Sequence, residues 1–161
     1  MSEKVILISI DGTRADAVDA CNNPYIEQLK KLGSYAPKAY SVMPSVTLPC
    51  HMSMFHSVTP ERHGILSNIY TPQVRPINGL FEQVKNAGKT AAMFYGWEPL
   101  RDVARPDSLL TAEFLHARAT EHTDALLTDR ALKAIEQWEP DFVFLYLVET
   151  DVMGLICRKI C

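Results

Sequence analysis

The chain has 161 residues, of which 47% are apolar and 22% are charged, and its net charge is -3. This composition is ordinary for one globular domain, and a chain of this length buries roughly 70% of its unfolded surface. The small negative charge gives no reason to expect nucleic acid or an anionic membrane as the main partner. No apolar run approaches the ~20 residues of a membrane span, and no signal-type leader precedes the first predicted strand, so we expect a cytoplasmic protein.

The first predicted element is the strand Val5–Ile10, which is apolar and largely β-branched on both faces. This pattern is typical of a strand buried in a parallel sheet. Asp11 and Gly12 follow at once, which places a carboxylate at the carboxyl edge of the sheet, where open α/β folds bind ligands. A second buried strand is predicted over residues 142–148, and Asp151 comes shortly after it. Two strands that each bring an aspartate to the same edge indicate a metal or phosphate site.

Helices and strands alternate between these two segments. Helices are predicted over residues 24–32, Thr47–His56, residues 79–87 and Thr123–Trp138, and a further strand over residues 89–95. The proline-rich stretch 59–78 is predicted to be a long loop, and the polar run 113–124 a solvated surface. The alternation predicts an α/β fold whose mostly parallel sheet carries helices on both faces.

The second group of candidate site residues lies in the sequence PSVTLPCH at residues 44–51. Thr47 begins a predicted helix, where backbone amides favour an anion, so a phosphate could dock there. A hydroxyl at this place can be an N-cap, a phosphate contact or a nucleophile. As a nucleophile it would need activation, which a divalent metal held by aspartates supplies. For His51 and His63 we expect packing or loop hydrogen bonds and no role as metal ligands.

These segments resemble the type I phosphodiesterases and nucleotide pyrophosphatases of the alkaline phosphatase superfamily. The resemblance rests on ISIDG at residues 8–12, PSVTLPCH at 44–51, PERHGI at 60–65 with the following Asn68, and the segment 146–154. It implies an alkaline phosphatase-like catalytic domain, of which residues 1–154 would be the N-terminal part. It also implies a metal-dependent hydrolase of phosphodiester or nucleotide pyrophosphate bonds, whose ligand is a phosphate ester or a nucleotide-like small molecule.

The resemblance further implies two divalent metal ions, zinc in the complete enzyme. Asp11 would bind one metal, Thr47 would be both its ligand and the nucleophile, and Asp151 would bind the second metal. Asn68 would donate a hydrogen bond to a phosphoryl oxygen. In the family a histidine follows the second aspartate in an Asp-x-x-Gly-His pattern, but Leu155 stands at that position here. Zinc sites usually take at least three protein ligands, so we expect this chain to bind catalytic metal poorly.

Two explanations for the missing ligands stay open. In the first, the chain is the N-terminal part of a longer enzyme, truncated or frame-shifted after Gly154, and residues 155–161 are a tail outside the family. In the second, it is a natural short protein, a catalytically dead phosphate-binding module of the same fold. A sulfatase or phosphomutase-like branch is a further alternative, but Cys50 lacks the Cys/Ser-x-Pro-x-Arg context of sulfatases. A truncated sheet would expose an apolar edge, so we expect self-association or a disordered tail after Val148.

Overall fold

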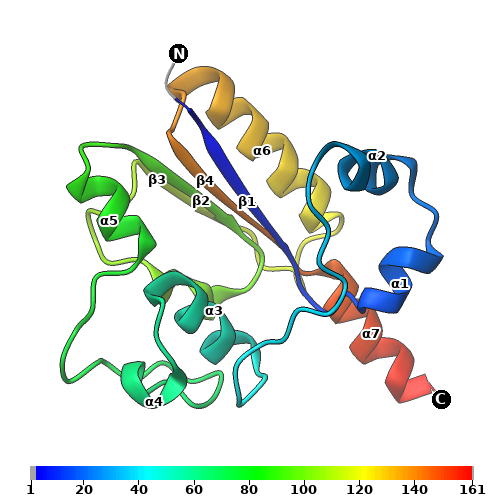
Figure 1. The fold of residues 1–161 in the computed structure, drawn as a ribbon, viewed down its shortest axis with the longest axis horizontal. Helices are drawn as coiled ribbons and strands as arrows, with labels where there is room; N and C mark the ends of the chain where they lie inside the picture. The colour runs from blue at the N-terminus through cyan, green and yellow to red at the C-terminus, as the bar shows by residue number, and fades with distance from the viewer. Residues whose placement is uncertain (1–2, 161) are drawn as a thin grey trace.

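The structure, a computed structural model, describes the backbone of residues 3–160 and the side chains of residues 3–154 (Figure 1). Its centre is one four-stranded sheet with the strand order β1-β4-β2-β3 and parallel pairing throughout. The strands are β1 (Val5–Ile10), β2 (Ala91–Tyr95), β3 (Thr111–Phe114) and β4 (Phe142–Leu147). The predicted α/β fold with a parallel sheet is therefore confirmed.

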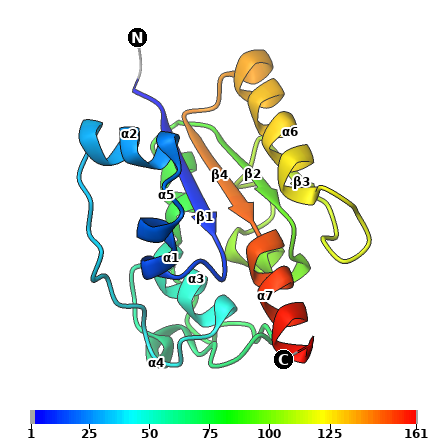
Figure 2. The same ribbon diagram turned by 90° about the vertical axis from the view of Figure 1, so that its right-hand side faces the viewer.

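Helices cover both faces of the sheet, as predicted (Figures 1 and 2). They are α1 (Ala15–Ala20), α2 (Pro24–Leu32), α3 (Thr47–His56), α4 (Pro60–His63), α5 (Leu80–Asn86), the 3-10 segment η1 (Glu98–Val103), α6 (Thr123–Trp138) and α7 (Glu149–Ile160). Helices α3 and α5 pack on one face and α6 packs on the other. Within the described part of the chain, no helix has the length and apolar character needed to cross a membrane.

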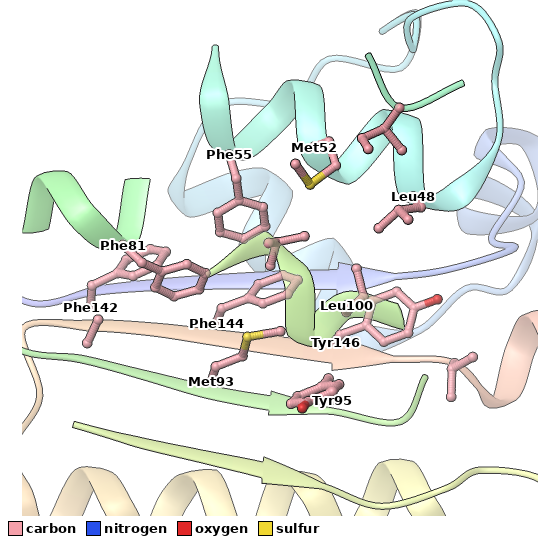
Figure 3. Packing of buried hydrophobic residues seen from close by; sticks show 14 residues of the cluster. Leu48, Met52, Phe55, Phe81, Met93, Tyr95, Leu100, Phe142, Phe144 and Tyr146 are labelled. Atoms are coloured by element: carbon pink, nitrogen blue, oxygen red, sulfur yellow. The ribbon is translucent and has the colours of Figure 1, made fainter. Parts of the chain in front are cut away.

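The larger core cluster lies between the sheet and helices α3 and α5. Alternate residues of β4 point to this side, where Phe144 meets Phe55 of α3 edge-on with ring centroids 4.8 Å apart. Phe55 in turn stacks on Phe81 of α5 at 4.9 Å, and Figure 3 shows these rings interleaved above β4. This packing fixes α3, and with it Thr47, against the sheet.

The second core cluster lies between the sheet and α6. Val143 and Leu145 point to this side of β4 and meet Leu127, Ala131 and Ala134 of α6. The strict alternation of β4 between the two clusters explains why its sequence is a continuous apolar run: both faces are covered.

Strand β1 departs from the prediction. Among the described residues it is an edge strand paired with β4 alone, and Ile6, Ile8 and Ile10 are 53%, 53% and 47% exposed. Their register partners on β4 belong to the cluster under α6 or lie beside it, but α6 packs over β4 and β2 and leaves β1 uncovered. The prediction that β1 is buried on both faces is wrong.

The segment after Val148 has a helical backbone, which differs from the predicted alternative of a disordered tail, while self-association through this segment stays a prediction. It forms helix α7 and no strand edge; the exposed apolar edge of the described sheet belongs to β1. The backbone of α7 runs without a break across the predicted boundary between residues 154 and 155. The side chain of Leu155 and those that follow lie outside the described residues.

Candidate functional site

The two aspartates that the sequence predicts at one sheet edge follow neighbouring strands. Asp11 comes directly after β1, and its amide donates to the carbonyl of Leu147 at the end of β4. Asp151 lies in the first turn of α7. The two segments touch at Gly12: a Cβ there would lie 2.6 Å from Asp151 Cα. The turn formed by Asp11 and Gly12 is therefore packed directly on the backbone of Asp151.

Thr47 is the first residue of α3, and its hydroxyl faces the Asp11 carboxylate. Thr47 Oγ1 donates to Asp11 Oδ2 at 3.3 Å. The N-cap position belongs to Val46, and no side chain caps the helix there. The simple interpretation of Thr47 as an N-cap therefore does not describe the structure, which presents its hydroxyl to a carboxylate at the carboxyl edge of the sheet.

Asn68 reaches this site from the loop that follows α4. Its Oδ1 accepts a hydrogen bond from the Leu48 amide at 2.9 Å. The Leu48 amide is thus satisfied by Asn68 and does not lie open to an anion, as the prediction of a bare helix N-terminus assumed. The contact fixes the carboxamide through its oxygen and leaves its NH2 group as the donor that can meet a ligand.

His51 joins α3 to β1 behind the site. Its Nδ1 lies 2.8 Å from the Thr47 carbonyl and its Nε2 lies 3.1 Å from Ser9 Oγ. A carbonyl only accepts, so Nδ1 carries the hydrogen and Nε2 accepts from the serine hydroxyl. Burial lowers the pKa of His51, which favours this neutral form. His63 similarly bonds to Ser53 and to a backbone amide, so both histidines make the hydrogen bonds expected of them, while their lack of a ligand role stays a prediction.

Tyr146 of β4 is a site neighbour to which the sequence prediction assigned no role. Its ring is 1% exposed, and its hydroxyl donates to Asp11 Oδ2 at 2.5 Å. Burial raises the pKa of Tyr146 far above its usual value, and the hydrogen bond to Asp11 raises it further, so the phenol stays protonated. The alternation of side chains along β4 places Tyr146 on the same face of the sheet as Phe144, which the sequence pattern can predict. The partner of its hydroxyl cannot be predicted in this way, because it depends on which strand lies beside β4.

Asp124, near the start of α6, is the second residue that sequence reasoning missed. Its two carboxylate oxygens accept the amides of Val148 and Glu149 at 2.9 and 3.0 Å. The unpaired amides at the start of α7 are therefore capped from another helix. Burial raises the pKa of Asp124, against the effect of these two bonds. The cap fixes the turn that carries Asp151.

A pocket of about 310 Å³ opens beside Asp151. Its walls follow three successive strands of the sheet: Trp97 comes after β2, His116 and Arg118 come after β3, and Val148 comes after β4. Trp97 also packs against the larger core cluster, which gives the pocket one fixed aromatic wall. The position fits the rule that open α/β sheets bind ligands beyond the carboxyl ends of their strands.

The carboxylate and hydroxyl oxygens at this edge are suitable ligands for a divalent cation, but the described residues supply only a few of them. Asp11 and Thr47 oppose each other, and Asp151 lies behind Gly12. Among the described residues, no group of three or more histidine, cysteine, aspartate or glutamate side chains is placed to hold a metal ion. Zinc usually takes at least three protein ligands, so any complete site would need donors beyond these.

Comparison with known proteins identifies the family of this chain. The family model for type I phosphodiesterase / nucleotide pyrophosphatase matches residues 5–155. Human ectonucleotide pyrophosphatase/phosphodiesterase family member 1 is 29% identical over 92% of this chain, and venom phosphodiesterase 2 of Crotalus adamanteus is 24% identical over 93%. The chain spans 18% and 21% of these two relatives, about a fifth of their length.

Solved structures share the fold. Murine ectonucleotide pyrophosphatase/phosphodiesterase 5, as an inactive variant in complex with AMP, superposes with a TM-score of 0.78 at 20% identity; the match covers 95% of this chain and 45% of that one. Phosphonoacetate hydrolase from Sinorhizobium meliloti 1021, in complex with phosphonoacetate, gives a TM-score of 0.66 at 21% identity, covering 92% and 46%. With the family model matching nearly the whole sequence, the chain belongs to the type I phosphodiesterase / nucleotide pyrophosphatase family.

Proposed function

We propose that this chain supplies the nucleophile, Thr47, of a metal-dependent phosphodiesterase or nucleotide pyrophosphatase active site. The observation that carries the proposal is the 3.3 Å contact between Thr47 Oγ1 and Asp11 Oδ2. It places an alcohol and a carboxylate together at the start of a helix and the carboxyl edge of the sheet. The AMP complex of the murine relative, whose inactive variant replaces a threonine by alanine, supports a nucleotide-like ligand.

The proposed reaction begins when Thr47 Oγ1 attacks the phosphorus atom of a phosphodiester. A new P–O bond forms, the bond to the leaving oxygen breaks, and that oxygen takes up a proton from solvent. Water then attacks the phosphothreonine ester, which releases the phosphate product and restores the Thr47 hydroxyl. Asp11 accepts the hydrogen of the Thr47 hydroxyl and keeps its oxygen facing the substrate. Asn68, held through its Oδ1, would donate its NH2 hydrogens to a phosphoryl oxygen as negative charge grows there. A bound divalent metal, for which zinc is our proposal, would lower the pKa of the hydroxyl and neutralise phosphate charge.

The pocket beside Asp151 supports an ester with an aromatic or nucleoside leaving group. Trp97 offers a flat apolar surface, and Arg118 offers a positive charge for a further phosphate. A pocket of about 310 Å³ lies at the lower end of the range for small-molecule sites. We therefore propose nucleotides and aromatic phosphodiesters as the first substrates to test.

A phosphate-binding module without catalysis is the alternative. The small number of ligand side chains among the described residues favours it. The negative charge of the site argues against a metal-free phosphate-binding module, because Asp11 and Asp151 lie at this edge and Asp124 lies nearby. The charges of all three carboxylates reach this edge, since each raises the pKa of Tyr146. A phosphate dianion approaching these carboxylates would be repelled unless a cation bound there first.

The deciding experiment measures AMP binding by calorimetry with added Zn²⁺ and, separately, with a chelator. The proposed function predicts binding that requires Zn²⁺, while equal binding in the chelator would establish the metal-free module. Hydrolysis of bis(p-nitrophenyl) phosphate is measured in parallel. Thr47→Ala should remove any turnover and keep AMP binding, whereas Thr71→Ala, in the exposed loop, should change neither. Turnover that survives in Thr47→Ala would refute the assigned nucleophile.

A further inference from the structure

We infer that Tyr146 is a positioning residue that sets the orientation of the Asp11 carboxylate. The inference rests on the proposed function, because that function gives the orientation its importance. Tyr146 lies opposite Ser9 in the register of β4 with β1, and Asp11 follows Ser9 by two residues. From there the tyrosine hydroxyl reaches Asp11 Oδ2 at 2.5 Å.

The ring of Tyr146 is held by its surroundings. It is 1% exposed and meets His51 edge-on, with ring centroids 5.3 Å apart and an interplanar angle of 81°. Figure 3 shows it beside Phe144, on the face of β4 that packs under α3. Because packing fixes the ring, the hydroxyl has one position, and the carboxylate meets a rigid donor. Such supporting donors orient metal ligands in proteins and set their affinity.

The contacts of Asp11 show which partner sets its orientation. Its Oδ1 accepts the Gly12 amide at 2.9 Å, and its Oδ2 accepts both Tyr146 and Thr47. The Thr47 contact, at 3.3 Å, is much longer than that of Tyr146. Donors at both oxygens fix the plane of the carboxylate, and a carboxylate keeps lone pairs beyond those two bonds. Tyr146 and Gly12 therefore hold the Asp11 carboxylate in place, and its remaining lone pairs can accept a hydrogen bond from Thr47.

Tyr146→Phe removes the hydroxyl and keeps the packed ring. Tyr95→Phe is the matched control: Tyr95 is the register partner of Tyr146 on β2, it is also buried, and its strand lies one place further from β1. Both variants delete one phenol oxygen from the same core cluster. A difference between them reports on the bond to Asp11.

The first measurement is a crystal structure of each variant without metal. We expect Asp11 to leave its wild-type rotamer in Tyr146→Phe and to keep it in Tyr95→Phe. The second is Mn²⁺ affinity by electron paramagnetic resonance, which should fall roughly 10-fold or more in Tyr146→Phe alone. An unmoved Asp11 in Tyr146→Phe would overturn the inference, as would equal Mn²⁺ affinity in the two variants. If the wild-type chain binds no Mn²⁺, the small number of ligand side chains among the described residues accounts for it, and the rotamer comparison alone decides the role of Tyr146.

Discussion

Replacing Gly12 by alanine would test the close packing that joins the two halves of the site. Gly12 has φ of +69°, a region that costs an L side chain about 1–2 kcal/mol. The new Cβ would also lie 2.6 Å from Asp151 Cα and 2.9 Å from its amide nitrogen, and backbone atoms cannot rotate away. Overpacking of this kind costs about 1–3 kcal/mol. After the smaller entropy of the unfolded alanine chain is allowed for, we expect Gly12→Ala to lower the free energy of unfolding by about 2–4 kcal/mol.

The chain contains a matched control for this variant. Gly88 has φ of +70°, and a Cβ added there would meet no atom within 4 Å. Gly88→Ala therefore carries the backbone strain without the clash and should cost about 1 kcal/mol. Urea unfolding followed by circular dichroism gives both values. Equal losses in the two variants would refute the contact between the Gly12 turn and Asp151.

Three further predictions concern α7, the buried histidines and β1. Asp124→Asn leaves one oxygen for the two amides at the start of α7. The free energy of unfolding should therefore fall by about 1 kcal/mol, and hydrogen exchange at those amides should accelerate. Unchanged exchange, measured by NMR, would exclude the cap. Burial lowers the pKa of all three histidines in α3 and α4, so the unfolded chain binds protons more readily. The free energy of unfolding should therefore decrease as pH falls below the ordinary value of 6.5, and His51→Gln should reduce this dependence; a pH-independent value would contradict it. Ile8→Lys should abolish concentration-dependent association in light scattering, at a stability cost under about 0.5 kcal/mol, and association that persists would place the interface elsewhere.

Elements with local sequence signals were predictable. Helices α3 and α6 have the predicted bounds, Thr47–His56 and Thr123–Trp138. They could be predicted because the signals for a helix, such as the spacing of apolar residues, lie within the segment itself. Asn23 caps α2 as its sequence indicates. The proximity of Asp11 to the turn that carries Asp151 followed from a general property of parallel sheets, whose strand ends share one edge. The proximity of Asp11 and Thr47 was implied only by the family resemblance.

The elements that were missed depend on partners far away in the sequence. The amides at the start of α7 are capped from α6 by Asp124, which lies 24 and 25 residues earlier in the sequence. Strand β3 is four residues long, and the predicted solvated surface overlaps its second half. The composition of β1 shows that it can be buried, but only the strand order and the position of α6 decide that Ile6 and Ile8 are exposed. The partner of the Tyr146 hydroxyl likewise follows from the pairing of β4 with β1.

The pairing of β1 has a consequence during synthesis. This strand is made long before β4, which begins at Phe142 and is its one partner within the described sheet. At typical elongation rates the ribosome needs roughly 7–26 s to make the intervening residues. Throughout that time the apolar, β-branched segment Val5–Ile10 lacks its partner strand of the described sheet. The pairing of β1 with β4 can therefore form only late in synthesis, and a chaperone that binds residues 5–10 should raise the yield of folded protein.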